Sequence, residues 1–192
     1  MRLIQLIPAV LILSSSGLSF AQDWIEYADR GERFSVNVPG KPTVQDTTYM
    51  SEDGGALPAR VYTAQEGLRR YSITVVNYAK ADVAVVRGSI AWAAWNFRKR
   101  GGEITYDAFA QVDRIEGHQL QITNPDKSRT FVAIHLHARR LYILEATVPP
   151  GWPPPGDFQQ SLMILDEQGN RIRYNLDNDG NRTTRVRPGQ GQ

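Results

Sequence analysis

Apolar and polar residues alternate along much of this chain, and this alternation constrains the fold more than any other feature of the sequence. The apolar Phe34, Val36 and Val38 are separated by Ser35 and Asn37, which is the period of a strand with one buried face. Further strand-like segments cover residues 24–28, 43–50, 59–64, 71–78, 103–112, 117–123, 129–137 and 140–148. The sequence therefore predicts a strand-rich domain.

One long segment, residues 81–100, changes to the period of a helix. Apolar residues recur there at spacings of three and four and form a single stripe: Val86, Ile90, Ala93, Ala94 and Phe97. An acidic residue stands near the start of the segment, three basic residues stand at its end, and two glycines follow. This is the charge polarity expected of a helix, so the sequence predicts an α+β fold.

The N-terminus is typical of a secretory signal peptide. A basic residue, Arg2, precedes the apolar run Leu3–Leu13, and small residues at Ser19 and Ala21 mark a cleavage site after Ala21. The apolar run is too short to cross a bilayer, which needs roughly 20 apolar residues. We therefore expect residues 1–21 to be removed, the mature chain to have no membrane span, and the protein to be periplasmic or secreted.

Composition limits the chemistry and the partners. The chain has no cysteine, which excludes disulfides, thiolate metal sites and cysteine nucleophiles. Its net charge is only +2, and its basic residues gather near the end of the chain rather than in a groove. Because nucleic-acid binding needs a clustered basic face, we expect no nucleic-acid partner.

We expect one α+β domain over residues 22–167, followed by an Arg-rich tail over residues 168–192. The stretch Leu165–Arg171, LDEQGNR, recurs as Leu176–Arg182, LDNDGNR. Each copy carries a glycine-containing turn, which predicts a hairpin. The tail is therefore expected to be hairpin-like, with no ordered structure beyond Arg185.

No segment carries a known catalytic signature. The loop at residues 39–42, PGKP, is followed by strand rather than helix, and Pro42 lacks a backbone donor, which argues against a phosphate-binding loop. Four carboxylates along and beyond one predicted strand are interpreted as solvated surface acids: Glu103, Asp107, Asp113 and Glu116. The sequence names no catalytic residue and no cofactor, which favours a protein that is not an enzyme.

His135 and His137 form the best candidate for a metal site. Residues two apart in a strand point to the same face, so both imidazoles could bind one ion. Their apolar neighbours take the other, core-facing side: Val132, Ile134 and Leu136. A third ligand would be needed, and His118 is the only other histidine. The alternative interpretation is two polar residues on a solvated or partly covered face.

Three tryptophans are candidates for a binding surface. Trp92 and Trp95 lie off the apolar stripe of the predicted helix, so they either pack on a second element or form an exposed patch for a partner or a sugar. Packing is favoured, because large exposed apolar patches are uncommon on monomers. Trp152 lies within the stretch 149–156, PPGWPPPG, which is stiff and extended because it is rich in proline.

The order of these elements resembles that of small exported bacterial proteins of the Mog1/PsbP-like α/β sandwich type. The similar segments are the strand and turn FSVNVPGKP at residues 34–42, the helix around Ala91–Trp95, the strand Arg140–Ala146 and a short helix at Phe158–Ser161. The resemblance covers about residues 23–165. It implies a central antiparallel sheet flanked by helices, here with a C-terminal β-hairpin extension, and a role in binding or assembly.

Two functional hypotheses follow. In the first, the protein is an exported, non-catalytic binding or assembly factor of the cell envelope. It would recognise another envelope protein through Trp92, Trp95 and Trp152. In the alternative, it is a periplasmic metal-dependent enzyme or metal carrier that uses His135 and His137.

Overall fold

The computed structural model describes residues 23–184. The two helices are α1 (Val83–Arg98) and α2 (Gly156–Gln159). The strands are β1 (Trp24–Asp29), β2 (Phe34–Pro39), β3 (Thr43–Met50), β4 (Ala56–Glu66), β5 (Arg69–Asn77), β6 (Glu103–Val112), β7 (Ile115–Thr123), β8 (Arg129–His137), β9 (Arg140–Val148), β10 (Met163–Ile164), β11 (Tyr174–Leu176) and β12 (Arg182–Thr184). The predicted strand-rich domain is confirmed, and its strands lie close to the predicted ranges. The expected signal peptide, residues 1–21, and the expected unordered end beyond Arg185 lie outside the described residues.

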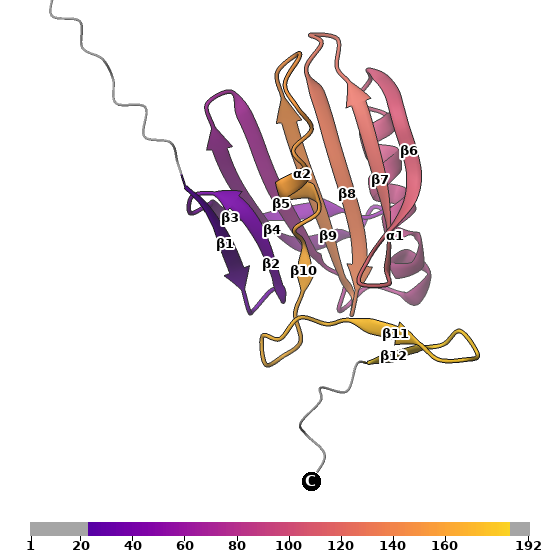
Figure 1. Cartoon of the computed structure of the whole chain (residues 1–192). Helices are drawn as coiled ribbons and strands as arrows, with labels where there is room; N and C mark the ends of the chain where they lie inside the picture. Colours follow the sequence, from indigo (N-terminus) through magenta and orange to yellow (C-terminus); the bar gives the residue numbers. More distant parts are fainter. Residues whose placement is uncertain (1–22, 185–192) are drawn as a thin grey trace, which may run out of the picture.

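Seven strands form one large antiparallel sheet, shown in Figure 1, in the order β3-β4-β5-β9-β8-β7-β6. The central pair, β8 and β9, is joined by a two-residue turn at Ala138 and Arg139, whose φ angles are 45° and 61°. Positive φ at both turn residues is the type I′ geometry that matches the twist of a hairpin. Neither of the two helices in the described residues is long and apolar enough to cross a membrane.

Helix α1 covers one face of the sheet, as its predicted apolar stripe requires. Ala93, Ala94 and Phe97 are buried against side chains from the strands beneath. We call this group the helix-side cluster: Leu57, Ala59, Val76, Tyr78, Ala93, Ala94, Phe97, Leu120, Ile122, Val132, Ile134, Leu141 and Ile143. The helix contacts β7, β8 and β9, so it extends from the central strand toward the β6 edge of the sheet.

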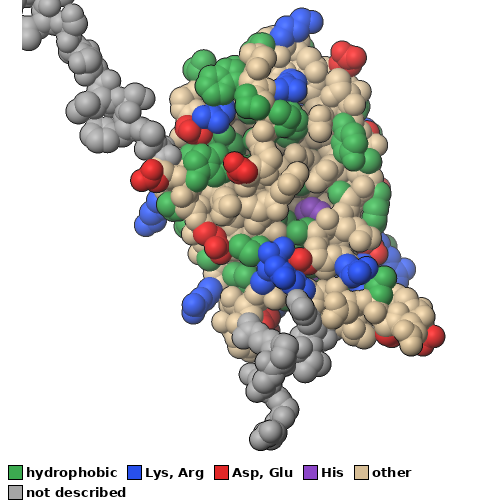
Figure 2. All heavy atoms as spheres, in the orientation of Figure 1, with side chains coloured by type: hydrophobic (Ala, Val, Ile, Leu, Met, Phe, Trp, Pro, Cys, Tyr) green, Lys and Arg blue, Asp and Glu red, His purple; other side chains and the backbone are tan. Residues whose placement is uncertain are grey.

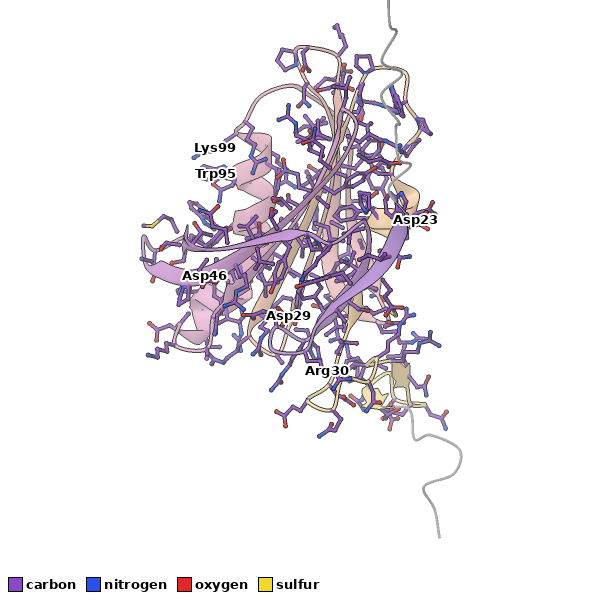
Figure 3. The ribbon with its side chains drawn as sticks, turned by 90° about the vertical axis from the view of Figure 1, so that its left-hand side faces the viewer. Asp23, Asp29, Arg30, Asp46, Trp95 and Lys99 are labelled. Carbon is purple, nitrogen blue, oxygen red and sulfur yellow. The ribbon has the colours of Figure 1, made fainter. Side chains whose placement is uncertain are left out.

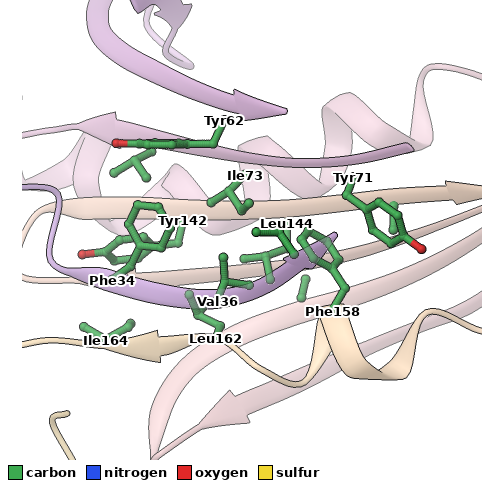
Figure 4. Close-up of a cluster of buried hydrophobic side chains, with 14 of the residues drawn as sticks. Phe34, Val36, Tyr62, Tyr71, Ile73, Tyr142, Leu144, Phe158, Leu162 and Ile164 are labelled. Carbon is green, nitrogen blue, oxygen red and sulfur yellow. The ribbon is translucent and has the colours of Figure 1, made fainter. Parts of the chain in front are cut away.

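A second layer covers the opposite face. It consists of the small antiparallel sheet β1-β2-β10 and the single-turn helix α2. Phe34, Val36 and Val38 are fully buried there. We call this buried group, most of which Figure 4 draws, the strand-side cluster: Phe34, Val36, Val38, Tyr62, Tyr71, Ile73, Val75, Ile115, Ala133, Tyr142, Leu144, Ala146, Phe158, Leu162 and Ile164. Because both faces are covered, the middle strands are buried on both sides.

The sequence repeat forms two hairpin turns with the same hydrogen bonds. In the first, Asp166 Oδ1 accepts from the backbone N–H groups of Gln168 and Asn170 at 2.9 and 2.7 Å. In the second, Asp177 Oδ1 accepts from Asp179 and Asn181 at 3.0 and 2.8 Å. The second turn joins β11 to β12, which confirms the predicted C-terminal hairpin. An Asp side chain that bonds to the backbone two residues ahead is a local signal, so the Asp, Gly and Asn that the two copies share produced matching turns.

Replacing Phe158 with alanine should destabilise the protein by about 3–5 kcal/mol, the usual cost of removing a buried phenyl ring. Phe158 is 1% exposed, and its ring packs edge-on against Tyr71 at 5.2 Å between centroids. Urea unfolding followed by circular dichroism measures the loss. Leu68→Ala is the control, because Leu68 is 77% exposed and its removal should change stability by less than about 0.5 kcal/mol. Equal effects of the two substitutions would mean that the second layer is not part of the core.

Candidate functional site

Trp92 and Trp95 stack on each other on the outer side of α1. Their ring centroids are 4.8 Å apart at an interplanar angle of 24°. Trp92 is half-buried, and its Nε1–H donates a hydrogen bond to the backbone carbonyl of Met50 at the end of β3. Trp95 is 42% exposed. Each sequence interpretation therefore describes one residue: Trp92 packs on a second element, and Trp95 presents an aromatic surface to solvent.

A cation and an exposed thioether side chain complete this surface. Lys99 lies one turn after Trp95 and places its Nζ 3.6 Å from the centre of the Trp95 ring, and Figure 3 shows the two side chains together on the outward side of α1. Met50, which holds Trp92 through its carbonyl, is 53% exposed. We call these four residues, Met50, Trp92, Trp95 and Lys99, the Trp92–Trp95 face.

Trp152 belongs to a different surface. It is 44% exposed in the proline-rich connection between β9 and α2, and the Arg69 guanidinium lies 4.8 Å from its ring centre. Arg129 Nη2 donates a hydrogen bond to its backbone carbonyl. Its contacts are with these two arginines of β5 and β8 and not with the helix tryptophans, so the structure does not unite the three predicted binding residues in one site.

His135 does not lie on a solvated face, which corrects that interpretation of the sequence. It is 3% exposed, and its Nδ1 has no hydrogen-bond partner among the described residues. The imidazole packs against Gly117 of β7, at a position where any larger residue would collide with the ring. The second layer covers this face of the sheet, and burial lowers the pKa of His135 to about 4, against a smaller opposing effect of backbone groups at Ile115 and Glu116.

His137 lies on the same face and is half-buried. A 2.8 Å hydrogen bond joins its Nε2 to the hydroxyl of Tyr174 in β11. Burial, and more weakly Arg182 and Arg33, lower the pKa of His137. A metal ion at this nitrogen would have to displace Tyr174.

The third histidine lies on the other side of the sheet. His118 stands opposite Ile134 in the β7–β8 pair, and Ile134 belongs to the helix-side cluster. His135 stands opposite Tyr142, which belongs to the strand-side cluster. Within residues 23–184 no group of three or more His, Asp, Glu or Cys side chains could hold a metal ion.

His118 instead forms an ion-paired group that the sequence analysis missed. Asp107 of β6 accepts two hydrogen bonds from the Arg98 guanidinium, at 2.7 and 2.8 Å, and lies 2.5 Å from His118 Nε2. The hydrogen bonds from Arg98, and more weakly the contact with His118, lower the pKa of Asp107 to about 2. Asp107 is at the surface, as the sequence interpretation expects, but it is paired rather than freely solvated. Its partners come from α1 and β7, and only folding brings them together.

A polar groove lies on the helix side of the sheet, beyond the C-terminal end of α1. Two rows of side chains cross β4, β5 and β9 there: Thr63, Ser72 and Glu145 in one row, and Gln65, Arg70 and Thr147 in the other. Lys41 and Thr43, from the turn after β2 and the start of β3, form its remaining wall. The hollow has a volume of about 540 Å³, within the usual range for ligand pockets.

The groove was also missed by the sequence analysis. The one local signal is the pair of polar residues two apart at the end of each strand, such as Ser72 beside Arg70, or Thr147 beside Glu145. Lys41 was considered there only for a phosphate-binding loop. No family model matches this chain, and a search of the curated proteins finds no match.

Stability should fall as the pH drops from about 6.5 to about 4 because of His135. Over this range the unfolded chain binds a proton at this imidazole and the folded protein does not, since its folded pKa is about 4. Proton binding to the unfolded state costs the fold roughly 3 kcal/mol at the acid end. Urea unfolding of wild type and of the His135→Leu variant at several pH values measures this loss of stability. The carboxylates titrate alike in both proteins, so the difference between the two pH profiles reports the imidazole. Parallel pH profiles would contradict the prediction.

Proposed function

We propose that the protein is an exported, non-catalytic binding or assembly factor of the cell envelope, and that its partner is another envelope protein. The signal-type N-terminus supports export. The observation that carries the binding role is the Trp92–Trp95 face, in which an exposed indole is held in place by a second indole and a cation. Tryptophan dominates the energetic centres of protein interfaces. A ring that is already ordered also loses little freedom when a partner binds.

The state of the titratable groups supports a non-catalytic role. Asp107 is already hydrogen-bonded to Arg98 and His118, and its low pKa makes it a poor base at neutral pH. His135 is buried away from solvent. A general base needs both access to a substrate and a pKa near the working pH, and neither group combines the two.

The fold that we propose is the Mog1/PsbP-like α/β sandwich of the sequence resemblance. Its support is the antiparallel sheet with α1 on one face and α2 on the other. The layer that contains α2 is built mainly from the strands β1, β2 and β10. Figure 2 views the face that carries α2, where acidic and basic side chains are interspersed. This favours protein recognition over nucleic-acid binding.

Trp95→Ala should weaken capture of the envelope partner at least about tenfold, the effect expected at an interface hot spot. Immobilised wild-type and variant proteins would be exposed to the same detergent-solubilised envelope extract, and the retained proteins would be quantified. Trp24→Ala is the matched control, because Trp24 is 36% exposed and belongs to β1 in the layer on the other side of the sheet.

Trp152→Ala tests the proline-rich surface separately. Unchanged capture by Trp95→Ala, with a loss of stability in its place, would show that the indole stack is structural and would remove the basis of the proposal.

The alternative function, a metal-dependent enzyme or metal carrier, is favoured by one observation. His135 and His137 lie on the same face of β8, and the buried Nδ1 of His135 lacks a hydrogen-bond partner among the described residues. Metal analysis of the purified protein beside a His135→Ala/His137→Ala variant tests it. A stoichiometric ion that disappears in the variant would establish the metal site. The competing bond from Tyr174 to His137 leads us to expect no such ion.

A further inference from the structure

The polar groove has a half-buried floor and exposed walls. Ser72, Glu145 and Thr147 are half-buried and form the floor. Lys41, Thr63, Gln65 and Arg70 are exposed and form the walls. The side chains of the floor come from neighbouring strands of one antiparallel sheet, which fixes their spacing without help from a ligand. A site built on strands is more rigid than one built on loops.

The groove carries an excess of positive charge in a chain whose net charge is only +2. The side chains of Lys41 and Arg70 form no hydrogen bond or salt bridge with another described residue, and the Arg70 charge only adds to the hydrogen bonds of Ser128 in lowering the pKa of the exposed Asp126. The one acid in the lining, Glu145, is neutralised by Arg100, whose Nη1 lies 2.7 Å from Glu145 Oε1. Two cations are therefore available to a ligand, and opposite charge attracts it. Guanidinium and ammonium groups bind carboxylates and phosphates through charge-assisted hydrogen bonds.

Hydroxyl groups line the same space. Thr43 and Thr63 share a hydrogen bond of 2.6 Å between their Oγ1 atoms, and Thr147 shares one of 3.0 Å with Thr130. A hydroxyl both donates and accepts, so such a lining suits a ligand that carries many hydroxyl groups of its own.

Other ligand classes fit this lining less well. The one aromatic residue in it, Tyr71, is 2% exposed and has its ring in the strand-side cluster, so a nucleotide base would find no ring to stack on. A lipid chain would need an apolar wall, and the only other apolar residues here are Pro39 and Ala64.

We propose that the polar groove binds an acidic saccharide, a polyhydroxylated ring that carries a carboxylate or a phosphate. The anionic group lies between Lys41 and Arg70, and the sugar hydroxyls bond to Thr63, Ser72 and Thr147. This site is separate from the Trp92–Trp95 face and does not depend on the protein partner proposed above.

Isothermal titration of purified protein with three probes tests the proposal. Trigalacturonic acid carries carboxylates, glucose 6-phosphate carries a phosphate, and maltotriose is a neutral saccharide. We expect at least one acidic probe to bind about tenfold more tightly than maltotriose, because only acidic probes can use the two free cations. The probe that binds identifies carboxylate or phosphate as the anionic group. Equal affinity for maltotriose, or no binding of either acidic probe at millimolar concentration, would overturn the proposal.

Matched variants separate a built site from general charge attraction. The double substitution Lys41→Gln/Arg70→Gln should weaken the binding of the acidic probe at least tenfold. Lys80→Gln/Arg87→Gln removes the same charge from exposed residues that do not line the groove, and it should leave binding unchanged. Equal losses in the two double variants would show non-specific attraction and contradict the proposal. Thermal unfolding confirms that each variant folds.

Two single substitutions complete the design. Thr63→Val removes an exposed hydroxyl at nearly constant volume and should weaken binding severalfold. Trp95→Ala should leave saccharide binding unchanged, because Trp95 does not line the groove. The capture experiment and the titration therefore test the protein-partner proposal and the saccharide proposal independently.

Discussion

Burial of both faces of the seven-stranded sheet is the constraint on which the rest of the structure depends. The inner strand β8, next to the central strand β9, has no exposed side chain from Thr130 to His135, so the sheet is stable only if a layer covers each side. Each fully buried large apolar side chain contributes about 1.5–3 kcal/mol. Helix α1 protects one face, and β1, β2, β10 and α2 protect the other. Removal of either layer would expose half of the core.

The size of α1 decides where a ligand could reach the sheet. A helix of 16 residues is about 24 Å long, whereas an eleven-residue strand such as β4 spans about 36 Å. The helix therefore leaves one end of the sheet uncovered. There the outward residues of β4, β5 and β9 change from apolar to polar, and the groove forms beside Arg100 just beyond the helix.

Ion pairs connect the outer parts to this frame. Arg98 and Arg100, near the end of α1, bond to Asp107 and Glu145 of the sheet, which holds the end of the helix and the Trp92–Trp95 face in position. Arg171 and Arg182 of the C-terminal segment bond to Asp113 and Glu116 around the β6–β7 turn. Exposed pairs of this kind contribute at most about 1 kcal/mol each, so they orient segments more than they stabilise the fold.

Sequence alone determined the features that depend on neighbouring residues. The alternation around Val36 predicted a strand, the stripe ending at Phe97 predicted α1, and the repeated Asp and Gly predicted two matching turns, because each signal lies within a few residues of its effect. Only the tertiary structure decided which surfaces are buried. Periodicity shows that a strand has two faces, but it does not show that a layer built from both ends of the domain, β1 and β2 before and α2 and β10 after, covers the face that carries His135. For the same reason the groove could not be predicted from the sequence, because Thr63, Ser72 and Glu145 form one row only through the register of three strands.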